Sequence, residues 1–209
     1  MRNRMIGVIA VGVVLAAAVT VGTVWRPWNR ADAALDGPVS GAGTAVLANY
    51  DVEQVQLPDP AVLQTLDGEA AVVLANSWQS AYPAITTVLT SMEVIFRYPD
   101  GRTYEVTLPE DRMAVSIAPY VSRTHPCITH FISGCQGELV GQEFDVRVTS
   151  GQAVVFEGTA TTQANGFFEL WLARDRTYTV EIMGLGRVAA GEFSTFDSSQ
   201  TCLTEFQLL

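Results

Sequence analysis

This chain of 209 residues is poor in three residue types: it has no lysine, two histidines and three cysteines. Its twelve basic residues are therefore all arginines, and 22 acidic residues leave a formal net charge of −10 at pH 7. A chain this acidic repels a phosphate backbone, and no basic cluster offsets the repulsion. The composition argues against nucleic acid as a partner, and we interpret the acidic charge mainly as a source of solubility.

Several familiar motifs are also missing from the sequence. It contains no Cys-x2-Cys pair, which is the usual half of a zinc-finger site. It contains no Gly-x-Ser-x-Gly elbow, Walker loop or His-Glu-x-x-His segment. With only two histidines, both close to cysteines in the sequence, a serine hydrolase is a poor interpretation as well.

The scarce residues gather in one segment. His125, Cys127, His130 and Cys135 place four of the five histidines and cysteines within residues 125–135. These side chains combine nucleophilicity and redox activity with affinity for soft or borderline metals. They suit Cu(I) or Zn(II), and hardly suit calcium or magnesium. The alternative is a simple Cys127–Cys135 disulfide with solvated histidines.

The same segment predicts a short helix. Thr124 and the proline two positions later fit an N-cap and a first-turn proline, and a Ser-Gly pair at 133–134 fits the helix end. Cys127 would lie in the first turn, where the helix dipole favours a thiolate, with His130 on the same face. Cys135 would lie just past the end, free to fold back toward both.

At this point the residues resemble a known family. The motif Thr-His-Pro-Cys-x2-His-x4-Cys-x2-Glu-Leu, followed by β pattern and a late cysteine, resembles the CueP family of periplasmic copper-binding proteins. The matching residues are His125, Cys127, His130, Cys135, Glu138, Leu139 and Cys202, and residues 165–172 and 201–203 also match. The resemblance covers roughly residues 45–209. It implies copper binding outside the cytoplasm, copper tolerance, copper supply to exported enzymes and thiol-driven reduction of Cu(II).

Residues 1–30 predict an export segment. The apolar run from Met5 to Trp25 follows two arginines and is long enough to span a bilayer. A small-x-small pattern at 31–33 fits signal-peptide cleavage equally well, so a signal peptide and a membrane anchor both stay open. Either way the body is exported, to the periplasm or the cell surface, and contacts a membrane only through this segment. Residues 31–43 read as a flexible linker.

Residues 44–120 predict a small α+β unit. Helical pieces are expected over 44–67, and the apolar segment 70–78 fits helix or strand equally. Three β-rich runs follow at residues 92–98, 103–108 and 113–117, the first two joined by a Pro-Asp-Gly-Arg hairpin signal. The family resemblance implies that this unit is a dimerisation domain, so a homodimer is expected on that ground alone.

Residues 121–209 predict the Cys/His segment followed by an antiparallel β-sandwich. Six short runs have strand composition and are separated by turn signals: 143–149, 153–159, 166–172, 178–182, 191–196 and 203–208. The expected fold class is therefore α+β, with an N-terminal anchor or signal, a dimerisation-like domain, and a sandwich that carries a short Cys/His helix at its start.

Three cysteines in an exported protein leave one unpaired if two form a bridge. The first and last strands of a small sandwich are often neighbours, so we expect Cys135 to pair with Cys202. Cys127 would then be the reactive thiol. The alternative is a local Cys127–Cys135 bridge with Cys202 buried and inert.

We predict an extracytoplasmic copper-binding protein whose ligands are Cys127, His130, Cys135, Cys202 and His125. Cu(I) is the favoured ion, and zinc is expected to bind more weakly. The family resemblance implies an exported copper enzyme, such as a superoxide dismutase, as the recipient. The alternative function is an exported thiol–disulfide oxidoreductase without a stable metal, in which Cys127 attacks and Cys135 resolves.

Overall fold

A computed structural model describes residues 56–209. The predicted signal or anchor, the linker and the first part of the helical stretch expected over 44–67 lie outside the described residues. Within residues 56–209, no helix is both long and apolar enough to cross a membrane.

The first described elements are two capped helices. Asp59 caps the 3-10 helix η1 (Pro60–Thr65), and Asp67 caps α1 (Gly68–Ala81) by accepting a hydrogen bond from the amide of Ala70 at 2.8 Å. The apolar segment that fitted helix or strand is therefore helical. Ala71, Ala75 and Trp78 face the core that α1 shares with the sheet beside it.

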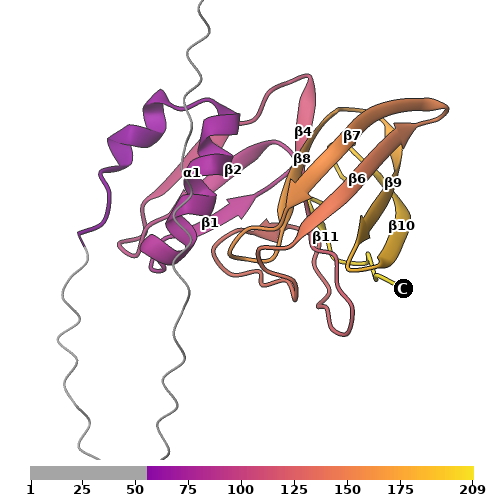
Figure 1. The fold of residues 1–209 in the computed structure, drawn as a ribbon. Helices are drawn as coiled ribbons and strands as arrows, with labels where there is room; N and C mark the ends of the chain where they lie inside the picture. Colours follow the sequence, from indigo (N-terminus) through magenta and orange to yellow (C-terminus); the bar gives the residue numbers. More distant parts are fainter. Residues whose placement is uncertain (1–55) are drawn as a thin grey trace, which may run out of the picture. The chain divides into compact units, whose positions relative to one another are not determined.

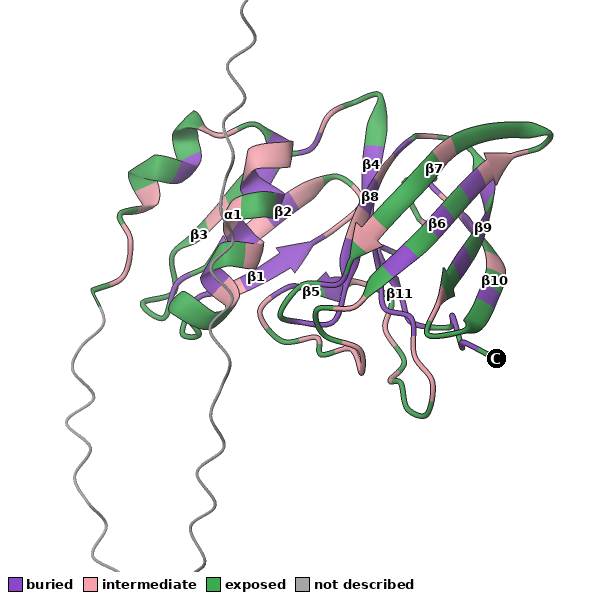
Figure 2. Cartoon of the chain, in the orientation of Figure 1, coloured by how far each residue is buried: buried purple, intermediate pink, exposed green. Residues whose placement is uncertain are grey.

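The helix α1 covers a four-stranded antiparallel sheet in the order β3-β2-β1-β5. Figure 1 shows α1 beside β1 and β2, and Figure 2 labels all four strands. Its strands are β1 (Thr86–Leu89), β2 (Glu93–Arg97), β3 (Thr103–Thr107) and β5 (His130–Phe131). The predicted hairpin joins β2 to β3, and Gly101 adopts the positive φ of 90° that this turn requires. Strands β1 and β5 were not predicted, and β5 is too short to be recognised from sequence.

The sandwich is built from two further sheets. The outer sheet has the order β10-β9-β6-β7, and the inner sheet has the order β11-β4-β8. Their bounds are β4 (Arg112–Ile117), β6 (Glu143–Ser150), β7 (Ala153–Thr161), β8 (Phe168–Ala173), β9 (Thr177–Gly184), β10 (Arg187–Ser194) and β11 (Cys202–Leu203). Buried and exposed residues alternate along β6, as Figure 2 shows, because only one face of the outer sheet contacts the core.

Strand β4 lies in the middle of the molecule rather than at the end of the N-terminal unit. Sequence analysis assigned it to residues 44–120, but it pairs with β8 and β11 of the sandwich. Its residues Met113 and Val115 enter the sandwich core, whereas Ala114 enters the core beneath α1. A domain boundary near residue 120 stays a prediction, with β4 contributing to both cores.

The last predicted strand, 203–208, is wrong in its extent. Regular pairing there is limited to β11, and an isolated parallel bridge joins Tyr120 to Gln207. The backbone continues alongside β4 through irregular hydrogen bonds, including Tyr120 N–H to Phe206 O at 3.0 Å. The local pattern could not reveal that this strand would run parallel to β4.

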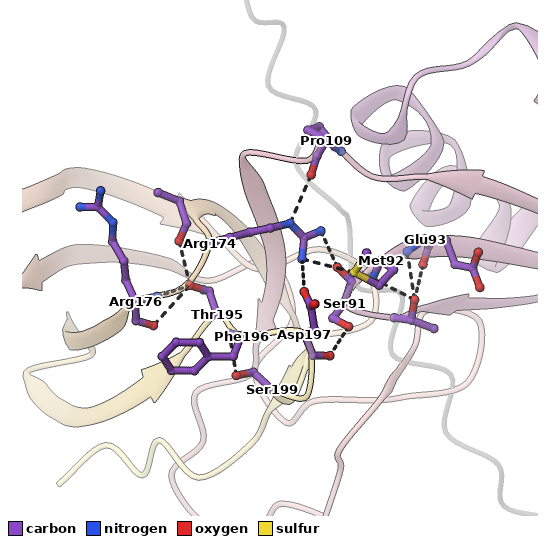
Figure 3. A network of polar contacts seen from close by, with 12 residues as sticks. Ser91, Met92, Glu93, Pro109, Arg174, Arg176, Thr195, Phe196, Asp197 and Ser199 are labelled. Atoms are coloured by element: carbon purple, nitrogen blue, oxygen red, sulfur yellow. Dashed lines mark hydrogen bonds and ion pairs between the residues drawn. The ribbon is translucent and has the colours of Figure 1, made fainter.

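Arg174, whose side chain is only 9% exposed, binds the loops at one end of the inner sheet. Arg174 donates to the carbonyls of Ser91 at 2.6 Å and Pro109 at 3.3 Å, and it pairs with Asp197 at 3.6 Å (Figure 3). Ser91 in turn donates to the carbonyl of Asp197 at 2.6 Å. These contacts tie the N-terminal sheet to the sandwich.

Candidate metal centre

The Cys/His segment does not form the predicted helix. Residues 123–127 have no regular secondary structure, and β5 and a turn follow. A helix this short has little intrinsic stability, and Ile128 and Thr129 are β-branched residues that disfavour it. The backbone instead finds partners elsewhere, since the carbonyl of Ile128 accepts from the amides of Thr201 at 3.0 Å and Cys202 at 3.3 Å.

Two threonines hold the segment against the C-terminal strand. Thr124 donates its hydroxyl to the carbonyl of Thr204 at 2.8 Å, and Thr204 donates its own hydroxyl to the carbonyl of His125 at 2.7 Å. At the start of the segment, Glu138 accepts from the amides of Val121 at 2.6 Å and Ser122 at 2.9 Å. These contacts place the residues after Thr124 directly opposite β11.

The disulfide joins Cys127 to Cys202, with their Cα atoms 5.5 Å apart. The predicted Cys135–Cys202 pairing is therefore wrong, and so is the alternative Cys127–Cys135 pairing. The sequence separation of 75 residues gives the bridge about 4 kcal/mol of stabilisation on chain-entropy grounds. Cys135 is the free thiol.

Cys135 is brought back to the disulfide by the turn after β5. Its amide donates to the carbonyl of Phe131 at 2.7 Å, and its Sγ lies 3.4 Å from the Sγ of Cys127. Burial raises the pKa of the Cys135 thiol, and the backbone of Phe131 acting on the sulfur partly offsets this effect. The thiol therefore stays protonated in neutral solution until a base, a metal or higher pH removes the proton.

Four of the five predicted ligands converge. One ligand atom each from His125, Cys127, Cys135 and Cys202 lies within 4.8 Å of the other three. Cys202 is buried and the other three are half-buried. All but Cys202 line an open pocket of about 630 Å³, where Phe131 contributes an apolar wall. The cluster is therefore reachable from solvent on one side.

The fifth predicted ligand, His130, lies behind the disulfide. Its side chain is fully buried, and its Nδ1 atom lies 3.6 Å from the Sγ of Cys202. The ring packs on Phe167, with the ring centroids 4.4 Å apart. Desolvation, assisted by the nearby His125, lowers the pKa of His130 to about 3. The imidazole is therefore neutral at physiological pH, as metal ligation requires.

Both histidines carry an unused ring nitrogen. Within the described part of the chain, neither Nε2 of His125 nor Nε2 of His130 has a hydrogen-bond partner, although both atoms are buried. Buried polar atoms are rarely left in this state without a functional reason. These two nitrogens without hydrogen-bond partners are chemically suited to bind a metal ion.

Sequence analysis gave no role to four residues that shape the site. Glu138 belongs to the family motif, but its capping of the loop at residues 121–123 depends on the fold. Phe167, which packs on His130, and Thr201 lie in the stretches that resemble the family but were given no role, and nothing in the sequence marked Thr204. The hydroxyl of Thr201 accepts from the amide of His130 at 3.0 Å across a separation of 71 residues.

Two comparisons with known proteins found similar proteins. The family described as periplasmic copper-binding protein CueP matches residues 73–207. The crystal structure of S.CueP is 34% identical in sequence, with a TM-score of 0.66, and the match covers 71% of this chain and 92% of that one. No curated protein matches the chain. Copper binding and an exported location follow from the family match, because this chain belongs to the CueP family of periplasmic copper-binding proteins.

Proposed function

We propose that this chain binds Cu(I) through the sulfur atoms of Cys127, Cys135 and Cys202, and that the redox state of these sulfurs controls binding. The observation that carries the proposal is the convergence of their ligand atoms with that of His125 within 4.8 Å. Thiolates are soft donors that select Cu(I), and neutral imidazole is compatible with it. His130, beside Cys202, completes the proposed set of ligands.

In this proposal, Cu(I) binding depends on whether the Cys127–Cys202 disulfide is reduced. While Cys127 and Cys202 are joined, only Cys135 offers a thiol, and one thiolate with an imidazole is a weak Cu(I) site. Reduction of the bridge by an external thiol would release two more sulfurs without moving the backbone segments that carry them. We therefore expect the reduced protein to bind Cu(I) strongly and the oxidised protein to bind it weakly.

The same sulfurs can supply electrons to Cu(II). Two thiols at Cys127 and Cys202 would reduce two Cu(II) ions to two Cu(I) ions, forming one disulfide and releasing two protons. The half-buried Cys127 and the pocket beside it give the incoming ion access. Repeated turnover requires an external thiol reductant to reopen the bridge.

A titration of the exported body with Cu(I) against a competing chelator tests the proposal. We expect about one Cu(I) per reduced chain, matching one cluster of donors. Cys127→Ser should lose most of the affinity, because it removes the central sulfur. Met183→Leu is the matched control, since it removes an exposed soft sulfur outside the cluster. If Cys127→Ser binds copper like the parent, the site lies elsewhere.

Zinc is the competing ion. Zn(II) accepts thiolate and imidazole ligands but prefers four of them in a tetrahedron. A site rich in thiolates and low in coordination number should prefer Cu(I). Displacement of Cu(I) by an equal concentration of Zn(II) under reducing conditions would overturn the copper preference.

The second candidate function is metal-free thiol–disulfide exchange. It is favoured by the distance of 3.4 Å between the sulfurs of Cys135 and Cys127. Reduction of a disulfide substrate by the metal-free protein, at an unchanged rate when a Cu(I) chelator is present, would favour this function over copper binding.

Two further proposals concern partners. Copper transfer to an exported enzyme such as a superoxide dismutase is tested by mixing the loaded protein with the metal-free enzyme and assaying its activity. A homodimer through residues 44–120 is tested by sedimentation of the exported body. Both come from the family resemblance, and neither is required for copper binding.

A further inference from the structure

Phe167 is a fully buried aromatic residue that belongs to neither of the two main cores of the protein. It forms a small cluster with Cys202 and Ala118, against which Cys127 and Cys135 pack. A phenylalanine is usually buried where it fills a large core and removes apolar area from water. Phe167 is instead grouped with the three cysteines, so it is part of the candidate metal centre rather than of either main core.

Both histidines of the protein lie against the ring of Phe167. The ring of His130 is tilted at 46° to it, with the two centroids 4.4 Å apart. The ring of His125 approaches in an edge arrangement at 64°, with a centroid separation of 6.4 Å. Aromatic rings attract one another in tilted and edge arrangements of this kind. One side chain therefore supports both imidazoles that the chain can offer to a metal.

This support matters because the ring nitrogens of the histidines have few polar partners. The Nε2 atoms of both rings are buried and, among residues 56–209, have no hydrogen-bond partner. The Nδ1 atom of His130 has the Sγ of Cys202 as a neighbour at 3.6 Å. In most metal sites a hydrogen bond from the second ring nitrogen fixes the orientation of a histidine ligand. Here the contact with an aromatic ring is available for that purpose.

Phe167 is itself held firmly by the turn that precedes it. Its amide donates to Oδ1 of Asn165 at 3.0 Å, and its carbonyl accepts from the amide of Gln163 at 2.7 Å. Asn165 is fully buried, and its side-chain amide donates to Oδ1 of Asn76 in α1 at 3.4 Å. A support positions a ligand well only if packing and hydrogen bonds fix the support too. Phe167 meets this requirement.

The same turn is bonded to the loop that follows the free thiol of Cys135. The carbonyl of Asn165 accepts from the amide of Gly137 at 2.7 Å, and the side chain of Gln136 donates to the carbonyl of Ala164 at 3.3 Å. The ring beside the histidines and the loop after Cys135 are therefore attached to one short segment of backbone.

We propose that Phe167 is a positioning residue of the copper site, which acts by holding the imidazoles of His125 and His130 in place beside the sulfur atoms. The inference rests on the proposed function, because it takes these histidines to be copper ligands. Phe167 itself does not bind the ion. It limits the orientations that each imidazole can take before the ion arrives, so less conformational entropy is lost on binding.

The Cu(I) affinity of the reduced protein, measured against a competing chelator, tests this role. Phe167→Leu keeps an apolar side chain at the position and removes the ring. We expect the affinity to fall by about 10- to 100-fold, the usual loss when the surroundings of metal ligands are disturbed. Phe168→Leu is the matched control, because it makes the same change at the next residue, whose ring is buried in the sandwich core. It should bind Cu(I) like the parent.

A double-mutant cycle separates positioning of the histidines from general damage to the fold. The second background is a chain that carries both His125→Gln and His130→Gln and keeps three cysteines as copper ligands. If Phe167 acts through the imidazoles, Phe167→Leu should cost little further affinity in this background. Damage that does not involve the histidines would add to the loss that their removal causes. An undiminished effect of Phe167→Leu in the second background would therefore overturn the proposal.

The histidine signals in NMR spectra of the oxidised, copper-free protein give a measurement that does not depend on copper. The chain has two histidines, so one His125→Gln spectrum assigns both sets of ring protons. The ring current of Phe167 should displace the protons of His130 more than those of His125, because its centroid lies closer. Phe167→Leu should move both sets toward the positions of free imidazole. Signals of His130 that do not move would contradict the proposal.

Phe167→Met replaces Phe167→Leu in both measurements if the leucine variant does not fold, since the flexible methionine side chain fills irregular space and has no ring. The titrations also distinguish failure of this inference from failure of the proposed function. A parent that binds no Cu(I) refutes the proposed function, and the inference with it. A parent that binds Cu(I) and does not lose affinity with Phe167→Leu refutes only the inference.

Discussion

The Sγ of Cys135 lies 3.4 Å from the Sγ of Cys127, which is itself bonded to Cys202. The Sγ of Cys127 therefore has two sulfur neighbours. It is bonded to Cys202 and could instead form a disulfide with Cys135. Attack by Cys135 would move the bond and free Cys202 beside His130. The arrangement accounts for the presence of a third cysteine in an exported protein.

We predict that this bond moves when the pH is raised. At pH 6 the oxidised, metal-free protein should contain almost only the Cys127–Cys202 bridge, because the pKa of Cys135 is raised by burial and its thiol is a poor nucleophile. Above the ordinary thiol range, a Cys127–Cys135 bridge should appear. Acid quenching and peptide mapping measure the two species. The Cys202→Ser variant should form Cys127–Cys135 completely, and its failure to do so would contradict the exchange.

Copper affinity should rise with pH. Each thiol that becomes a ligand must lose a proton, and the raised pKa of Cys135 keeps that proton in place through neutral pH. The apparent Cu(I) affinity of the reduced protein should increase about tenfold per pH unit for each proton displaced. Competition with a chelator between pH 6 and 8 measures the slope, and a slope of zero would mean that Cys135 is not a ligand.

Buried His130 should make the oxidised protein sensitive to acid. Its pKa is lowered to about 3 from an ordinary value of 6.5, so the unfolded chain binds the proton more tightly. Stability from this group is complete above pH 6.5 and is lost as the pH falls toward 3. In urea unfolding, His130→Gln should flatten the decline in stability between pH 6.5 and 4, whatever its stability at neutral pH.

Glu169 changes the pH dependence of stability in the opposite direction to His130. The Glu169 variant is therefore the comparison for the His130 variant. Burial raises the pKa of Glu169 to about 7 from 4.5, and the folded state holds the proton more tightly. Stability from this group is present below pH 4.5 and is lost as the pH rises through 7. Glu169→Gln should therefore steepen the acid sensitivity that His130 causes. An unchanged slope in the His130 variant would mean that other groups set the acid limit.

The backbone of Gly166 contacts the backbone of Gly137 so closely that we expect no side chain to fit at Gly166. Gly166 has a φ of +78°, and a Cβ atom there would lie 2.8 Å from backbone atoms of Gly137. Gly166→Ala should reduce the free energy of unfolding by roughly 2 to 4 kcal/mol, combining backbone strain with the clash. Gly151→Ala is the control, since it has a φ of +58° with open space around it. Equal losses in the two variants would show that the contact is unimportant.

The sequence determined the chemistry of the site and much of the local structure. The kinds and spacing of the residues from His125 to Cys135 predicted soft-metal or thiol chemistry without any tertiary information. Strand composition and turn signals predicted the strands β6 to β9, and the Pro-Asp-Gly-Arg turn predicted the β2–β3 hairpin. These signals are local, because each depends on side chains that are neighbours along one strand or turn.

Only the tertiary structure decided which cysteines form the disulfide and which side chains contact it. The helix signals around Cys127 were outweighed by hydrogen bonds to residues 201–204, more than seventy positions away. The parallel pairing of β11 with β4 places Cys202 opposite Cys127 and beside Ser116. The spacing of residues along the chain does not predict the register between β11 and β4, because that register depends on how whole faces of the sheets pack. The sequence therefore shows that the ligands are present, and the packing of β4 between two cores decides where each of them lies.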